Sequence, residues 1–174
     1  MAGAAAAMSI PEAAAASSDF RWCSRCQAMW FTAGGDNGHC PVSHLWDHNH
    51  YLNGSGIYTI RRATESGVGQ PGWHWCANCK AVWYLGRGER GFGVCPIWPT
   101  VGHSPGQPVP DLLRDSFRLE DVGNNDGPGG QTDWRFCHRC NGLFFAGNGI
   151  AATHCPSGGA HDGSQSGNYV LRVS

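Results

Sequence analysis

Three stretches of the chain share one alternation of apolar and polar positions. Aromatic residues stand two positions apart before a C-x-x-C, which places both on one face of a strand. A short apolar run follows the second cysteine, so the pattern predicts a strand, a two-cysteine turn and a second strand. The three stretches are FRWCSRCQAMWF from Phe20, WHWCANCKAVWY from Trp73 and WRFCHRCNGLFF from Trp134.

Each stretch continues in the same order to a third cysteine and a closing strand. A glycine-rich segment leads to a Cys-Pro, with 13, 15 and 14 residues between the second and third cysteines. An aromatic-x-aliphatic segment then ends each unit, and polar, turn-rich residues 61–72 and 120–133 separate the units. We therefore expect three repeats, at residues 20–60, 73–119 and 134–172.

The composition favours short strands and loops over long helices. Only 14% of the 174 residues are charged, against roughly 25% in an average globular protein, and 26 are glycine. The net charge of −1, without a run of Lys or Arg, argues against a duplex-binding protein. No apolar stretch reaches the length of about 18 residues that a membrane span needs. Units of this size bury only small cores, so we expect a further cross-link.

The cysteine count points to metal ligands. The chain has nine cysteines, three in each unit. Complete disulfide pairing would leave one thiol over, and no unit could pair its own set. Metal binding explains the odd count if each unit supplies one more ligand of another type.

Histidine is the candidate for the fourth ligand. His50 and His161 each lie eight positions before the aromatic residue of their closing strand, a register that selects His50 over His44 and His48. His103 is the only histidine between the third cysteine and the closing strand of the second unit. The predicted groups are Cys23, Cys26, Cys40 and His50; Cys76, Cys79, Cys95 and His103; and Cys137, Cys140, Cys155 and His161.

The chemistry of these groups suits zinc. Three thiolates and one imidazole give a tetrahedral site, and a closed set of four protein ligands is structural. Such an ion contributes folding free energy, on the order of 10 kcal/mol in zinc-finger peptides. We therefore expect three structural zinc ions. Disulfides with a free thiol, an iron site and redox thiol chemistry are the alternatives.

The repeats and their metal sites predict the fold class. We expect an all-β protein of three pseudo-symmetric zinc-stapled β-hairpin units, which close around a pseudo-threefold axis as in a β-trefoil. The alternative is a row of tandem zinc-ribbon-like units. Residues 20–174 form a single domain in the first interpretation. The Ala-rich residues 1–19 are expected to form a flexible arm, or one that docks on a partner.

The third unit also resembles a repeat of uncharacterised microbial proteins. The shared pattern is W-x-x-C-x-x-C-x-G-L-F-F, then C-P-x-G-G-x-H and S-G-x-Y-x-L, and the resemblance covers residues 20–172. The first unit departs at CPVSHLWDHNH, and the second departs at CPIWPTVGH and by a long insertion. The resemblance implies no activity.

No catalytic motif is present. The zinc-deaminase pair H-x-E and P-C-x-x-C, the H-E-x-x-H helix, G-x-S-x-G and the Walker P-loop are all missing from the sequence. We therefore do not expect an enzyme. Reduced zinc thiolates favour the cytosol, and secretion without a visible signal peptide stays open.

The expected function is a non-catalytic binding module that recognises a glycan or protein ligand through its loops. Trp46 and Trp98 fall in loops after the third cysteine and are the candidate ligand-binding residues. One alternative is a structural subunit that self-assembles or docks into a larger complex through residues 1–19. Another is single-stranded nucleic-acid binding, in which aromatic residues stack on bases, although the low number of basic residues weighs against it.

Overall fold

The computed structural model describes residues 17–33, 35–42, 46–86, 88–106 and 111–174. These residues contain one 3-10 helix, η1 (Ile150–Ala152), and no α-helix, so the predicted all-β class is confirmed. No helix in this part of the chain has the length and apolar character needed to cross a membrane. The strands are β1 (Ser17–Trp22), β2 (Met29–Phe31), β3 (Tyr58–Arg62), β4 (Gln70–Trp75), β5 (Val82–Tyr84), β6 (Phe117–Asp121), β7 (Gln131–Phe136), β8 (Leu143–Phe145) and β9 (Tyr169–Val173).

The strands on either side of each C-x-x-C form antiparallel hairpins. β1 pairs with β2, β4 with β5, and β7 with β8. The register is the same in the three hairpins, because the first aromatic residue of the repeat pairs with the last. The pairs are Phe20 with Phe31, Trp73 with Tyr84, and Trp134 with Phe145.

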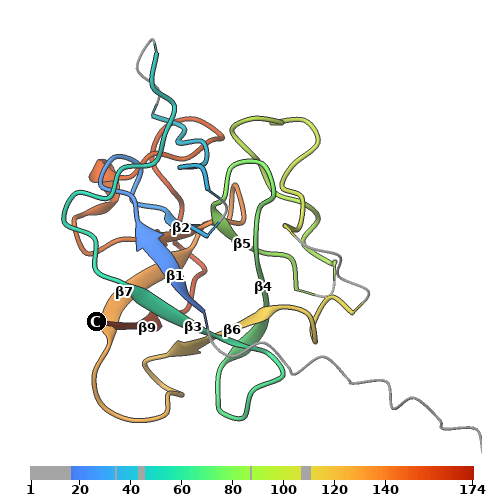
Figure 1. Ribbon diagram of the computed structural model, residues 1–174, viewed down its shortest axis with the longest axis vertical. Helices are drawn as coiled ribbons and strands as arrows, with labels where there is room; N and C mark the ends of the chain where they lie inside the picture. The colour runs from blue at the N-terminus through green and yellow to red at the C-terminus, as the bar shows by residue number, and fades with distance from the viewer. Residues whose placement is uncertain (1–16, 34, 43–45, 87, 107–110) are drawn as a thin grey trace, which may run out of the picture.

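The closing strands join the hairpins into one nearly closed antiparallel sheet. β3 pairs with β1, β6 with β4, and β9 with β7. In addition, β3, β6 and β9 pair with one another in all three combinations. Figure 1 shows these three strands in the lower half of the molecule, while the loops that follow β2, β5 and β8 extend toward the upper end.

One hydrophobic core lies inside this sheet and draws on all three units. Hairpin and closing strands both contribute, because their alternate side chains face inward. The units therefore share one core and are not a row of separately folded units. The buried core residues are Phe20, Met29, Tyr58 and Ile60 from the first unit, Trp73, Val82, Phe117 and Leu119 from the second, and Trp134, Phe136, Leu143, Tyr169 and Leu171 from the third.

The start of the first strand differs from the sequence-based expectation. β1 begins at Ser17 because this residue pairs with Ile60 of β3, so residues 17–19 belong to the sheet and not to the arm. The rest of the predicted arm, residues 1–16, lies outside the described residues.

Candidate metal centres

Each C-x-x-C forms a tight turn that its own backbone closes. The N–H of the first cysteine donates to the carbonyl oxygen two residues after the second cysteine, at 2.8 to 3.0 Å. The residue after the second cysteine adopts positive φ and donates its N–H to the carbonyl oxygen of the first cysteine. These residues are Gln27 (φ 66°), Lys80 (φ 63°) and Asn141 (φ 63°). The turn explains why two cysteines separate two aromatic strands, since it directs both sulfurs to one side.

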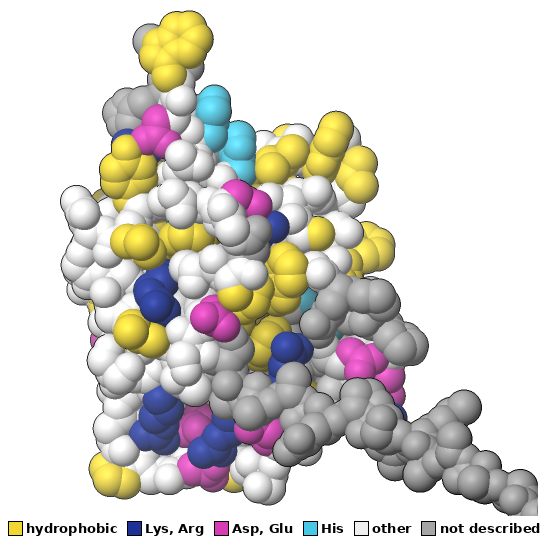
Figure 2. Space-filling model, in the orientation of Figure 1, with side chains coloured by type: hydrophobic (Ala, Val, Ile, Leu, Met, Phe, Trp, Pro, Cys, Tyr) yellow, Lys and Arg dark blue, Asp and Glu magenta, His cyan; other side chains and the backbone are white. Residues whose placement is uncertain are grey.

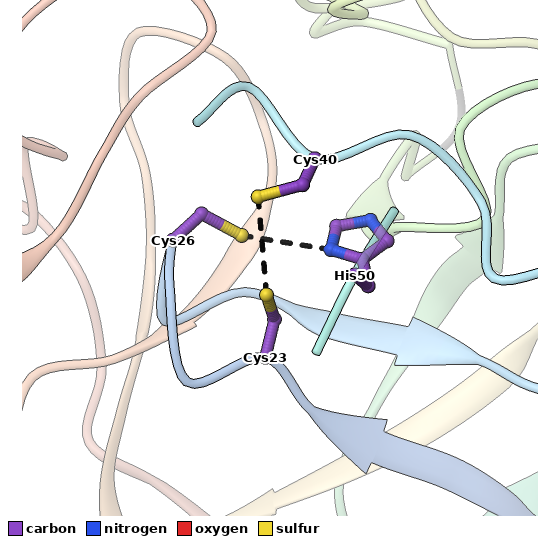
Figure 3. Close-up of side chains that lie close together, drawn as sticks. All are labelled: Cys23, Cys26, Cys40 and His50. Atoms are coloured by element: carbon purple, nitrogen blue, oxygen red, sulfur yellow. Dashed lines mark hydrogen bonds between the residues drawn. The ribbon is translucent and has the colours of Figure 1, made fainter. Parts of the chain in front are cut away.

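The structure brings together the twelve cysteines and histidines in the three groups that the sequence predicts. In each group the third cysteine and the histidine come from the long loop that follows the hairpin, and all four side chains are buried. Figure 3 shows Cys23, Cys26, Cys40 and His50 pointing toward one another. The four potential ligand atoms of each group lie within 4.8 Å of one another.

The distances within the groups fit a tetrahedral ion. Zinc bonds of about 2.3 Å to sulfur and about 2.0 Å to nitrogen place two sulfurs about 3.8 Å apart, and a sulfur and a nitrogen about 3.5 Å apart. The Sγ atoms of Cys23 and Cys40 are 3.9 Å apart, and those of Cys137 and Cys155 are 3.8 Å apart. The Sγ of the second cysteine lies 3.6, 3.5 and 3.5 Å from the histidine Nδ1 in the three groups.

The ligand histidines present Nδ1 to the sulfurs. His50 shows the reason most directly, because its Nε2 lies 3.1 Å from the carbonyl oxygen of Cys79. A carbonyl only accepts, so Nε2 carries the proton and Nδ1 of the neutral ring keeps a lone pair for a metal. Of the two competing histidines, His48 is exposed and His44 lies outside the described residues.

An aromatic ring of the second hairpin strand supports each ligand histidine. The rings stack, with interplanar angles of 11° to 24° and centroid distances of 4.5 to 5.2 Å. Stacking limits the rotation of the imidazole and so fixes the direction of Nδ1. The pairs are Trp30 with His50, Trp83 with His103, and Phe144 with His161.

Backbone N–H groups also point at the sulfurs. The residue that follows each ligand histidine donates its N–H to Sγ of the first cysteine, at 3.4 Å from Tyr51, 3.5 Å from Ser104 and 3.4 Å from Asp162. Such donors stabilise a thiolate. The identity of the residue does not matter for this contact, because the main chain makes it.

The sulfurs of one group control each other's protonation. Burial raises the pKa of the second cysteine's thiol well above its ordinary value in all three groups. Hydrogen bonds with neighbouring cysteines hold the pKa of Cys23 and of Cys76 well below that value. The hydrogen bond with Cys23 raises the pKa of Cys40 to about 12. A buried group therefore needs a cation before all three of its thiols can ionise.

Backbone hydrogen bonds link the three groups in a cycle. The residue before the third cysteine of one unit donates its N–H to the carbonyl oxygen of the second cysteine in the next unit. The bonds run from His39 to Cys79 (3.1 Å), from Val94 to Cys140 (3.2 Å) and from His154 to Cys26 (3.3 Å). Each candidate site is thus held partly by a neighbouring unit.

Sequence reasoning missed the glycines that allow the loop of one unit to approach the C-x-x-C turn of the next. Gly38 and Gly93 have φ of 62°, and a Cβ at either position would collide with the carbonyl oxygen of Cys79 or Cys140. The signal was available, since glycine stands two positions before the third cysteine in the first two units. In the third unit Thr153 takes this place, directly after η1.

A small cavity of about 20 Å³ lies between the three groups. The ligand imidazoles and the prolines of the three Cys-Pro pairs line it, together with a few neighbouring side chains. About 10–15 Å³ of such volume accommodates one water molecule. The space between the groups is therefore too small for an organic substrate.

The two tryptophans predicted to bind a ligand lie at the surface. Trp46 is 95% exposed and Trp98 is 54% exposed. Neither side chain makes a ring contact or a hydrogen bond within the described part of the chain. Nothing in their surroundings identifies a ligand, so their role stays a prediction.

Comparison of the chain with known protein families, curated proteins and solved structures finds no match. The resemblance to a microbial repeat therefore stays a prediction.

Proposed function

We propose that each of the three groups holds one structural zinc ion. The observation that carries this proposal is the tetrahedral spacing of three sulfurs and one imidazole nitrogen in a fully buried group. Four protein ligands leave no open position for a water or a substrate, which is the arrangement of structural sites. Zinc binding would take the place of the apolar core that the long loops lack.

The sulfur distances argue against the disulfide alternative. All nine cysteines are free, and the sulfurs of Cys23 and Cys40 and of Cys137 and Cys155 are 3.8 to 3.9 Å apart, against about 2.05 Å in a disulfide. Iron also accepts thiolate ligands, and metal analysis distinguishes it from zinc.

We also propose that the three units are arranged around an approximate threefold axis, as in a β-trefoil. Three features support this arrangement: the common register of the hairpins, the mutual pairing of β3, β6 and β9, and the cycle of hydrogen bonds between the metal groups.

We infer that the protein is a non-catalytic binding module, which uses the zinc-stapled fold to present loops to a glycan or protein ligand. The exposure of Trp46 and Trp98 supports this inference, because large aromatic side chains at a surface contribute much of the affinity in recognition. Figure 2 shows hydrophobic side chains on the loops at the upper end of the molecule. Assembly through residues 1–19 and single-stranded nucleic-acid binding remain the alternative proposals.

Native mass spectrometry of the freshly purified chain, beside its denatured mass, tests the metal proposal. We expect three zinc ions per chain and no loss of mass from paired thiols. A metal-free chain with disulfides would overturn the proposal, and bound iron would replace zinc. The same spectrum reports any oligomer, which would favour the assembly alternative.

The binding proposal is tested on glycan and protein arrays with the wild-type chain and the Trp46→Ala and Trp98→Ala variants. Binding that either variant weakens by about tenfold or more supports recognition through the loops. Binding that both variants retain in full contradicts it.

A further inference from the structure

A pocket of about 220 Å³ opens where the first and third units meet, away from the residues of the metal groups. Its wall consists of Trp22, Gly54 and Tyr58 from the first unit, Phe145 and Asn148 from the third, and Gln131 at the start of β7. None of these side chains is charged. Pockets for drug-sized ligands measure roughly 300–1,000 Å³, so this one suits a single neutral ring.

The amide of Gln131 is held in one orientation. The hydroxyl of Tyr58 donates to Gln131 Oε1 at 2.6 Å, and the indole N–H of Trp134 donates to the same atom at 3.1 Å. An indole nitrogen only donates, so the accepting atom must be the oxygen. The NH₂ group of Gln131 has no hydrogen-bond partner among the described residues and remains available as a donor.

The amide of Asn148 is also held in one orientation, but through its nitrogen and not its oxygen. Its Nδ2 donates to Oε1 of Gln27 at 2.9 Å, across the boundary between the units. Oδ1 of Asn148 is left as an acceptor, without a partner in the described part of the chain. The pocket thus presents one oriented donor and one oriented acceptor.

The aromatic wall stays accessible because residue 54 is glycine. Gly54 has φ of 77°, and a Cβ there would lie 3.6 Å from the Trp22 ring. A longer side chain would cover the indole. Trp22 is half-buried and meets Phe145 edge to face, with ring centroids 6.4 Å apart.

We propose that this pocket binds one sugar ring. The apolar C–H face of a pyranose would pack on the indole of Trp22. Two adjacent sugar hydroxyls would accept from the Gln131 amide and donate to Oδ1 of Asn148, because a hydroxyl does both. The absence of charge in the wall favours a neutral sugar over a phosphate or carboxylate ligand. This inference rests on the proposed binding function. It places the sugar site in this pocket and not at the loops that carry Trp46 and Trp98.

The corresponding contacts between the other units are built differently. Between the first and second units, the rings of Phe31 and Trp75 stack with centroids 4.8 Å apart. The closing strand of the second unit has Phe117 where the first has Tyr58. Between the second and third units, the hydroxyl of Tyr169 binds Gln70 at 2.6 Å, but the aromatic residue there, Phe136, is buried. These differences supply matched controls.

The experiment titrates the zinc-loaded protein with methyl glycosides of glucose, galactose, mannose and N-acetylglucosamine, and with uracil as a planar non-sugar probe. Side-chain amide signals of Gln131 and Asn148 are followed by ¹H–¹⁵N NMR. We expect saturable shifts of both signals with at least one glycoside, at millimolar concentrations because one ring makes few contacts.

Three variants test the geometry. Asn148→Ala and Gln131→Ala each remove one hydrogen bond and should weaken binding about 2- to 10-fold. Gln70→Ala is the control for Gln131→Ala, because it also removes the acceptor of a buried tyrosine hydroxyl but leaves the pocket intact. Gly54→Asn should abolish binding by covering Trp22. Gly35→Asn is its control, since Gly35 has the same φ of 77° and no atom near the added Cβ.

The outcomes separate this inference from the proposed function. Binding lost in Gly54→Asn but kept in Trp46→Ala and Trp98→Ala supports the pocket. Binding lost in the tryptophan variants but kept in Gly54→Asn overturns the pocket and leaves recognition through the loops standing. No glycoside binding, or shifts with uracil alone, overturns the sugar proposal. The zinc content of the same sample reports independently on the metal sites.

Discussion

Different chemistry organises the two ends of this molecule. The upper end in Figure 1, here called the metal end, consists of the long loops with the three Cys and His groups. The lower end, here called the strand end, consists of β3, β6 and β9, which pair with one another. Figure 2 shows Lys or Arg and Asp or Glu side chains close together at the strand end. There the buried carboxylate of Glu120 contacts Arg172 at 2.6 Å and Arg61 at 3.8 Å.

The two ends differ in what completes them: the residues of the chain at the strand end and, on the zinc proposal, a bound ion at the metal end. Backbone pairing and charged side chains of the chain itself complete the strand end. The clusters at the metal end contain little beyond the cysteines, one large aromatic residue and a few aliphatic side chains in each unit. On the zinc proposal, an ion keeps these loops ordered. Damage at the two ends should therefore differ in its effect on metal content.

The largest effect is expected from the loss of one ligand. Cys140→Ser should remove one of three zinc ions and lower the free energy of unfolding by about 4 kcal/mol or more, because the site is buried and closed. Zinc content from native mass spectrometry and the unfolding midpoint in urea measure both effects. His138→Ala changes an exposed residue of the same turn and should alter neither. Full zinc content in Cys140→Ser would contradict the assigned group.

A smaller effect is expected where one unit touches the metal site of the next. Gly38→Ala places a Cβ against the carbonyl oxygen of Cys79, at positive φ. We expect a loss of about 3 kcal/mol from strain and overpacking together. Gly35→Ala has similar backbone strain without the collision and should lose only about 1 kcal/mol. If urea unfolding shows equal losses of stability in the two variants, the contact between the units contributes nothing to the free energy of unfolding.

The strand end should weaken without any loss of zinc. Glu120→Gln removes the charge that Arg61 and Arg172 share, and we expect a loss of about 2 kcal/mol. The two arginines are about a third exposed, which keeps the loss below that of a fully buried pair. Thermal unfolding combined with zinc analysis checks this expectation. A variant that also releases zinc would mean that the two ends are not separate.

The smallest effect is expected at the tip of a metal-end loop. Trp46 is almost fully exposed, so Trp46→Ala should change the free energy of unfolding by less than about 0.5 kcal/mol. Thermal unfolding of the variant beside the wild type is sufficient. A larger loss would show that this side chain packs on the protein and is not free to meet a ligand.

The metal groups could be predicted from sequence because the spacing of their cysteines recurs in three units. The position of His50 and His161, eight residues before an aromatic strand residue, carried information that one copy would not hold. The pocket between the first and third units could not be found in this way, because Gln131 and Asn148 meet Trp22 only when the third unit closes on the first. The sequence did contain one signal that was not used. Two of the closing strands have a tyrosine, Tyr58 and Tyr169, and two hairpin strands, β7 and β4, begin with the glutamines that bind them.

The pairing of β3 with β9 also has a consequence for synthesis. β9 leaves the ribosome after the other eight strands, and until then β3 and β6 each lack a neighbour. Pairing between residues as distant as Tyr58 and Val173 is slow, because a long loop must close first. Ribosome-bound chains that lack residues 169–174 should therefore be cut readily by protease, and protection at that stage would contradict this order. The sheet of the first unit is completed only after translation of the third.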